Sequence, residues 1–192
     1  MARQPTFDRA EVVRAAMEVF WREGYQGASI KQLGEAMGLM PGSIYAAFGS
    51  KEGLFREVLD AYVARVRGGA SAERVAPRTI LERWFAEHIA AATATPEGRG
   101  CLLLNSAFEV QAIDPGPAER VREELAALEA FFETCVKAAR RGEGAEGRDG
   151  HPTPKATARL LVAALGGISM LSRAGASKRS LEDVARASLA AV

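Results

Sequence analysis

The sequence predicts an all-α protein. Apolar residues recur at the three- and four-residue spacing of a buried helix face, and no run alternates apolar and polar β-branched residues as a strand would. Alanine and arginine are abundant, whereas aromatic residues make up only 7% of the chain, which favours helices. With 192 residues, 48% of them hydrophobic and 26% charged, the chain has room for one ordinary domain or two small ones with a real core.

Composition also excludes several classes of protein. Two cysteines, Cys101 and Cys135, are too few for a disulfide framework, and no CxxC pair is present that would bind structural zinc. No apolar stretch follows the first residues, and the longest uncharged apolar segment, between Arg159 and Arg173, is shorter than the roughly 20 residues of a membrane span. We therefore expect a cytoplasmic protein with reduced thiols, no membrane partner, no metal and no cofactor.

The first helix is predicted to begin at Asp8 and to end at Gly24 and Gly27. Asp8 followed by Glu11 resembles a capping box, which satisfies backbone N–H groups at a helix start. Glycine is a common helix terminator, so the two glycines mark its end. The predicted inward face comprises Val12, Val13, Ala16, Met17, Val19 and Phe20.

Two short helices are predicted next. Ser29 with Gln32 forms a second capping box, and Gly38 is placed to end this helix in the left-handed conformation. Pro41 suits the first position of the following helix, which Gly49 ends. The residues predicted to face inward are Ile30, Leu33 and Met37 on the first of these helices, and Ile44 and Phe48 on the second.

Ser50 is expected to cap a fourth helix that runs to about Arg67, where two glycines follow. Its inward residues are Leu54, Val58 and Tyr62. Further helices are predicted from Thr79 to about Ala94, from Leu102 to about Ile113, from Pro117 to about Arg141, from Thr153 and Pro154 through Leu171, and from Ser180 to about Ala190. The glycine-rich stretch 142–150 is predicted to be a loop. We divide the chain into an N-terminal domain (1–50), a connecting helix (51–67) and a C-terminal domain (68–192).

The segment from Ser29 to Lys51 carries the functional signal. Two short helices joined by a glycine-containing turn make a helix-turn-helix. Gly34 lies in the middle of the first of these helices, at a position where a side chain would obstruct close packing of the second. A helix held in this way stands out from its domain and fits the major groove of B-form DNA.

The segment from Phe20 to Phe55 resembles the DNA-binding domain of the TetR family of transcriptional regulators. It reads FWREGYQGASIKQLGEAMGLMPGSIYAAFGSKEGLF. The shared pattern is an aromatic-Gly-Tyr turn, Ser/Thr at the start of the second helix, Gly-Leu/Val in the turn, and Gly-Ser/Thr-Ile/Leu-Tyr leading to Phe and Ser-Lys-Glu. The remaining two thirds of the chain match only in helix count and length. The resemblance implies an all-helical homodimer with one helix-turn-helix per subunit, followed by a helical bundle that binds an effector and whose last two helices pair across the dimer.

The resemblance also implies which residues contact DNA. They are Ser29, Lys31, Gly42, Ser43, Tyr45 and Lys51. A serine hydroxyl and free backbone N–H groups at a helix start suit a phosphate, and the two lysines are phosphate contacts. The glycine lets the backbone approach the duplex, while Ser43 and Tyr45 face outward.

Two departures from the family pattern bear on base recognition. Met40 stands where the family often has a serine, so its side chain cannot cap the next helix. Ala47 stands where a histidine is common, and neither Ala46 nor Ala47 can donate a hydrogen bond, although alanine can contact a thymine methyl. We therefore expect phosphate positioning and DNA shape to outweigh bidentate base contacts.

Charge alone does not identify a DNA-binding surface. The whole chain has a formal net charge of +1, and residues 1–66 carry eight basic and eight acidic residues. DNA binding requires Arg3, Lys31 and Lys51 on one face with the acidic residues elsewhere.

An effector pocket is expected among aromatic and titratable residues of the second domain. The candidates are Trp84, His88, Cys101, Phe108, Phe131 and Cys135. The simpler alternative is that the aromatic residues and the cysteines are core. Cys101 lies near a predicted helix start, where the helix dipole lowers a thiol pKa, so it is also a candidate redox sensor. Gly166 and Gly167 would permit close approach of another helix, which favours a dimer interface over a flexible kink.

These observations predict a ligand-responsive transcriptional regulator rather than an enzyme, because no Ser-His-Asp set, H-E-x-x-H motif or phosphate loop is present. We expect a repressor that binds a near-palindromic double-stranded operator as a homodimer. An unknown small-molecule effector, or cysteine modification, would release it, with residues 51–67 as the lever. The alternatives are a helical interaction module and a constitutive DNA binder without an effector.

Overall fold

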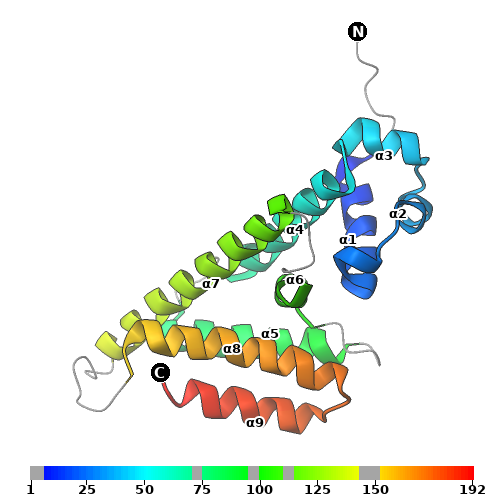
Figure 1. Ribbon diagram of the computed structural model, residues 1–192. Coiled ribbons are helices and arrows are strands. Elements are labelled where there is room, and N and C mark those ends of the chain that lie inside the picture. Colours follow the sequence, from blue (N-terminus) through cyan, green and yellow to red (C-terminus); the bar gives the residue numbers. More distant parts are fainter. Residues whose placement is uncertain (1–6, 71–74, 95–99, 110–114, 143–151) are drawn as a thin grey trace. The chain divides into compact units, whose positions relative to one another are not determined.

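The computed structural model describes residues 7–70, 75–94, 100–109, 115–142 and 152–192, which contain nine helices and no strand (Figure 1). The all-α prediction is confirmed. The helices are α1 (Arg9–Gly27), α2 (Ile30–Met37), α3 (Pro41–Phe48), α4 (Lys51–Ala70), α5 (Pro77–Thr93), α6 (Leu102–Glu109), α7 (Pro115–Gly142), α8 (Pro154–Arg173) and α9 (Lys178–Leu189).

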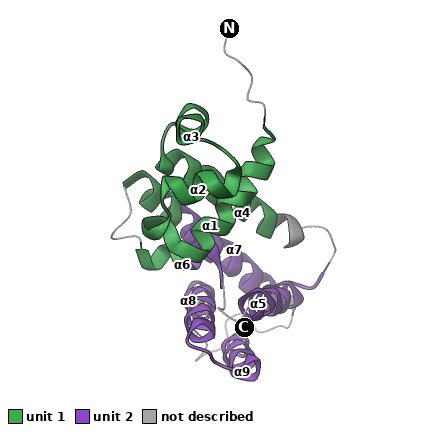
Figure 2. Cartoon of the chain, turned by 90° about the vertical axis from the view of Figure 1, so that its right-hand side faces the viewer, with its two compact units in different colours: residues 1–68, 105–122 green, residues 69–104, 123–192 purple. Residues whose placement is uncertain are grey.

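The chain forms two compact units (Figure 2). Unit 1 comprises residues 1–68 and 105–122, and unit 2 comprises residues 69–104 and 123–192. Helices α6 and α7 therefore contribute to both units. The two units are defined by contacts between residues. The boundaries expected after residues 50 and 67 were placed by the function assigned to each part, so they stay a prediction.

Local capping explains the start of unit 1. Asp8 Oδ1 accepts hydrogen bonds from the backbone N–H groups of Ala10 (2.9 Å) and Glu11 (3.3 Å) at the start of α1. Ser29 and Gln32 form the predicted reciprocal capping box at the start of α2. The left-handed end of α2 is also confirmed, since Gly38 has φ +64°.

Aromatic side chains fill the core of unit 1. Phe20 and Phe55 meet edge to face with ring centroids 5.1 Å apart, and Tyr25 contacts Phe55 in the same way at 4.9 Å. Gly34 permits the close crossing of α2 by the turn that follows it, because a Cβ at this position would lie 2.7 Å from the carbonyl oxygen of Leu39. The predicted need for a small residue at position 34 is confirmed.

Unit 2 is held together by buried polar contacts as well as by apolar packing. Arg140 on α7 donates to the carbonyl oxygens of Pro152 (2.7 Å) and Ala191 (2.8 Å) and to Thr157 Oγ1 (2.9 Å). The Ser172 hydroxyl donates to the carbonyl oxygen of Ala92 at 2.7 Å, which joins α8 to α5. Such bonds matter because an unpaired polar group in an apolar interior is costly.

Several predicted boundaries in the second half of the chain require correction. The last helix is capped by Ser177, whose side chain accepts from the N–H of Ser180, so the predicted cap at Ser180 is wrong. Helix α5 begins at Pro77 rather than Thr79, and α7 at Pro115 rather than Pro117, since proline suits the first helical turn. The predicted ends of α6, in 110–113, and of the 142–150 loop lie outside the described residues.

None of the described helices is both long enough and apolar enough to cross a membrane.

Candidate nucleic-acid interface

Helix α3 is fixed on its inner side by two buried residues and an arginine. Ile44 is fully buried and Phe48 is 8% exposed. The Arg9 guanidinium lies over the Phe48 ring, 4.4 Å from its centroid, and its Nη2 donates to the carbonyl oxygen of Ala47 at 3.0 Å. This bond satisfies one of the carbonyls that a helix end leaves without an intrahelical partner.

Arg9 also connects α3 to α4. Its Nε donates to Glu57 Oε2 at 3.0 Å, and this hydrogen bond raises the pKa of Arg9 by favouring the charged guanidinium. Arg9 therefore joins α1, the end of α3 and α4 in one contact set. Sequence reasoning missed this role, because no local pattern relates residue 9 to residues 47, 48 and 57.

The opposite side of α3 faces solvent. Gly42 and Ser43 are exposed, and Tyr45 is 50% exposed. Met40, the N-cap residue of α3, makes no side-chain hydrogen bond to the helix start and is 75% exposed. The outward position expected for Ser43 and Tyr45 thus agrees with the structure, and their contact with DNA stays a prediction.

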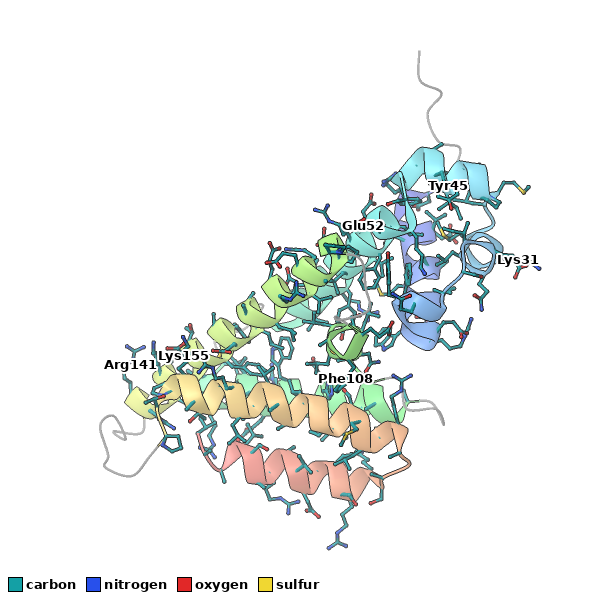
Figure 3. The ribbon with its side chains drawn as sticks, viewed as in Figure 1. Lys31, Tyr45, Glu52, Phe108, Arg141 and Lys155 are labelled. Atoms are coloured by element: carbon teal, nitrogen blue, oxygen red, sulfur yellow. The ribbon has the colours of Figure 1, made fainter. Side chains whose placement is uncertain are left out.

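The start of α2 presents a second set of candidate groups. The Ser29 hydroxyl is engaged in the cap, since Oγ accepts from Gln32 N (3.2 Å) and lies 2.6 Å from Gln32 Oε1. The hydroxyl thus shapes the helix start, whose first backbone N–H groups have no intrahelical acceptor, and the contact of Ser29 with DNA stays a prediction. Lys31 extends from this turn with a side chain that is 87% exposed, and its nearest carboxylate, Glu35, is 4.0 Å away (Figure 3).

Lys51 lies in the first turn of α4, directly after the Ser50 cap. Ser50 Oγ accepts from Gly53 N at 3.1 Å. A cation at a helix N-terminus is disfavoured by the helix dipole, and here the ammonium group lies over the Tyr25 ring, 4.6 Å from its centroid. The combined positive charge of Lys51 and the helix start favours an anion such as a phosphate.

Acidic residues gather in one groove of unit 1, which includes Glu35, the carboxylate nearest to Lys31. A groove between α1 and the end of α2 is lined by Asp8, Glu11, Glu18 and Glu35, with Arg14 as its one basic residue among the described lining residues. Four carboxylates disfavour a phosphate backbone. Arg3, the third cation that the sequence assigned to the DNA-binding face, lies outside the described residues.

The residues expected to form an effector pocket are only partly brought together. Trp84 meets Phe131 and Phe132 with ring centroids 5.8 and 5.5 Å apart, and Phe131 is 37% exposed. Of these two phenylalanines on α7, Phe132 is the fully buried one. Phe108 belongs to unit 1 and is 68% exposed, so its interpretation as a core residue is wrong.

His88 contacts α8. Its Nε2 lies 3.0 Å from the carbonyl oxygen of Leu165 and 2.9 Å from Ser169 Oγ. Because the carbonyl can only accept, Nε2 carries the hydrogen. Burial lowers the pKa of His88 to about 4, so the ring is neutral at physiological pH.

Both cysteines are buried thiols. Cys101 lies just before α6, and Cys135 lies on α7, where burial raises its pKa. A raised pKa disfavours the reactive thiolate. No three histidine, cysteine, aspartate or glutamate side chains in the described ranges form a group that could hold a metal ion.

The chain is similar to known proteins along nearly its whole length. The family model described as "Bacterial regulatory proteins, tetR family" matches residues 12–58, and "Tetracyclin repressor-like, C-terminal domain" matches residues 77–188. The HTH-type transcriptional repressor ComR of Escherichia coli (strain K12) is 30% identical over 193 residues, covering 97% of this chain and 90% of ComR. The HTH-type transcriptional repressor DhaR of Mycobacterium sp. (strain GP1) is 30% identical, covering 71% of this chain and 65% of DhaR.

A solved structure shares the fold and includes DNA. It is a cysteine mutant of the TetR family transcriptional regulator CifR in complex with 26-base-pair double-strand operator DNA. That chain is 31% identical to the present one with a TM-score of 0.73, and the match covers 97% of this chain and 98% of CifR.

Proposed function

This chain belongs to the TetR family of bacterial transcriptional regulators, and on that basis we propose that it is a repressor which binds a near-palindromic operator as a homodimer and is released by a small effector. The observation that carries the proposal is the construction of α3. Ile44 and Phe48 anchor its inner side, while Ser43 and Tyr45 lie on the exposed side. A short helix presented in this way is suited to the major groove.

The proposed DNA-binding surface combines that side of α3 with two flanking helix starts. Lys31 at the start of α2 and Lys51 at the start of α4 supply phosphate contacts on either side of the recognition helix in the chain. The acidic groove beside α1 supports this choice of surface, because its carboxylates would repel a phosphate backbone. Affinity would then come largely from phosphate contacts and would fall with salt.

A homodimer is supported by an apolar stripe on α8. Its exposed members, together with the C-cap residue Ala174, recur three, four or seven residues apart and are Ala156, Leu160, Ala163, Met170 and Ala174. Leu160 is 45% and Met170 57% exposed, and nothing described in this chain lies within 4 Å of a Cβ built at Gly166 or Gly167. We propose that this stripe packs on its counterpart in a second copy, and that the homodimer reads two half-sites about 34–36 Å apart on one face of the duplex.

Effector binding is proposed for unit 2, near Trp84 and Phe131. These two side chains form a partly exposed aromatic pair, a surface that suits an apolar or aromatic small molecule. A ligand that favours a dimer with the wrong half-site spacing would need a coupling free energy of about 1–3 kcal/mol. Helix α4 is the proposed lever, because it continues from the Lys51 turn to the boundary of unit 1.

The test is fluorescence anisotropy with duplexes covering the DNA beside the protein's own gene. Wild-type protein is expected to bind one duplex specifically, and Lys31→Ala is expected to reduce the salt dependence by about one phosphate contact. Arg122→Ala is the matched control, since it removes an exposed cation of unit 1 that lies outside the proposed surface. Equal effects of the two variants, or no duplex bound above a scrambled control, would refute the proposal.

A further inference from the structure

The recognition helix and its flanking turns lack the side chains that usually read bases. Residues 39–50 have the sequence LMPGSIYAAFGS, with no Arg, Lys, Asn, Gln, Asp or Glu. Those six residue types make the paired hydrogen bonds that distinguish guanine, adenine and cytosine in the major groove. The structure describes all of residues 39–50, so the side chains of α3 and its flanking turns are all accounted for, and none can make such a paired hydrogen bond.

The helical register shows which groups of α3 lie outermost. Ile44 and Phe48 point inward, and a rotation of about 100° per residue places Ala46 directly opposite them, with Gly42 about 40° to one side. Ala46 is exposed, and a Cβ built at Gly42 would have no neighbour within 4 Å. We call the exposed surface formed by Gly42 and Ala46 the ridge of α3, and it is the part that would enter a groove deepest. It consists of backbone at Gly42 and of a single methyl group at Ala46.

A longer apolar group lies at the N-terminal end of α3. Met40, at the N-terminal end of α3, is 75% exposed, and Pro41 after it is also exposed. The hydroxyl groups of Ser43 and Tyr45 flank the ridge rather than forming its crest, which suits them to phosphates. The surface that meets the base edges is thus almost wholly apolar.

The following inference rests on the proposed operator binding. We propose that this protein reads its operator through thymine C5-methyl groups, which the Ala46 methyl and the Met40 side chain contact in the major groove. The thymine methyl is the one apolar group on a base edge in that groove, so it is the natural partner of an apolar ridge. Each half-site then carries thymine at the positions beneath Ala46 and Met40. Burying one methyl-sized apolar group changes affinity about fourfold, so the expected effect is measurable.

The experiment replaces each thymine of a half-site in turn by deoxyuridine, which removes only the methyl group. At one or more positions wild-type binding is expected to weaken about fourfold. In Ala46→Gly or Met40→Ala the corresponding penalty is expected to fall below about twofold, because the protein side of the contact is gone. Ala61→Gly, at an exposed position of α4, is the matched control for the helix cost of glycine and should keep the full penalty.

The outcomes separate this inference from the proposed function. Specific operator binding with every uracil penalty below about twofold would overturn the methyl contact and leave the repressor proposal standing. Penalties that persist unchanged in both variants would overturn the assignment to Ala46 and Met40. Failure to distinguish the operator from a scrambled duplex would overturn both proposals, and circular dichroism of each variant shows whether it is folded.

Discussion

The carboxylate of Glu109 on α6 accepts a hydrogen bond from the backbone N–H of Gln26 on α1, with 3.0 Å between Oε2 and N. Gly24 makes this contact feasible, because it has φ +72° and a Cβ at its position would collide with the same carboxylate. The break in α1 that leads into the helix-turn-helix is therefore built around a side chain 83 residues further along the chain. All three residues belong to unit 1.

Replacing Gly24 by alanine should destabilise the protein. The positive φ and the collision with Glu109 together predict a loss of about 2–3 kcal/mol in the free energy of unfolding. Gly27→Ala is the control, since its Cβ would meet only Glu23 Cβ at an ordinary 3.6 Å. Urea unfolding followed by circular dichroism measures both, and equal stabilities of the two variants would contradict this account.

Replacing Gly42 by alanine should separate folding from DNA binding. The open space around Gly42 predicts that the free energy of unfolding stays the same or rises by up to about 1 kcal/mol, because alanine is the better helix former. Operator affinity should fall about tenfold, because the added methyl keeps the backbone of α3 from the base edges. Anisotropy titrations check the second effect. A variant with wild-type affinity would show that this position does not approach DNA.

Arg9→Met should weaken operator binding by removing the contacts that hold the C-terminal end of α3 in place. The ion pair with Glu57 is nearly half exposed and contributes little, so the free energy of unfolding should fall by only about 1 kcal/mol. Operator affinity should fall several-fold, because the bond to the Ala47 carbonyl and the contact with Phe48 are both lost. Arg14→Met, on the exposed side of the same helix, is the control. If both variants bind alike, Arg9 does not position α3.

Arg140→Met should be strongly destabilising. The arginine is buried, and its removal leaves three carbonyl oxygens and the Thr157 hydroxyl without their donor. The expected loss is about 3 kcal/mol in the free energy of unfolding. Arg141→Met, at the next and exposed position, should cost less than about 0.5 kcal/mol. Thermal and urea unfolding of the two variants measure the difference. Similar losses in the free energy of unfolding would show that the hydrogen bonds of Arg140 do not stabilise unit 2.

His88 should make stability depend on pH. Its pKa is lowered from 6.5 to about 4, so the unfolded chain binds a proton between these values that the folded protein does not. Full stability is therefore present above pH 6.5 and is lost as the pH falls toward 4, by about 2 kcal/mol at pH 5.

Urea unfolding at pH 7.5 and pH 5.0 measures this dependence. His88→Gln cannot take up the proton, so it should lose about 2 kcal/mol less than the wild type over this interval. Carboxylates that titrate below pH 5 affect both proteins equally and cancel in the comparison. Identical pH dependence in the two proteins would show that His88 keeps its ordinary pKa in the fold.

Local signals in the sequence predicted the helix-turn-helix well. The Ser29–Gln32 capping box, the left-handed Gly38 and the first-turn Pro41 each act within four residues, so neighbouring residues suffice to define them. The same rules failed at the last helix, where Ser177 and Ser180 are both good caps. The turn through Gly175, with φ +83°, leaves Ser177 at the helix start.

The sequence by itself determined the helical class, the family, the helix-turn-helix and the inward face of α3, because periodicity and capping are properties of adjacent residues. Only the tertiary structure showed that Arg9 supports the end of α3, that Glu109 holds the break in α1, and that Phe108 is exposed while Phe132 is buried. Such pairs join residues up to 83 positions apart, and a side chain's partner at that separation depends on how helices pack rather than on local spacing.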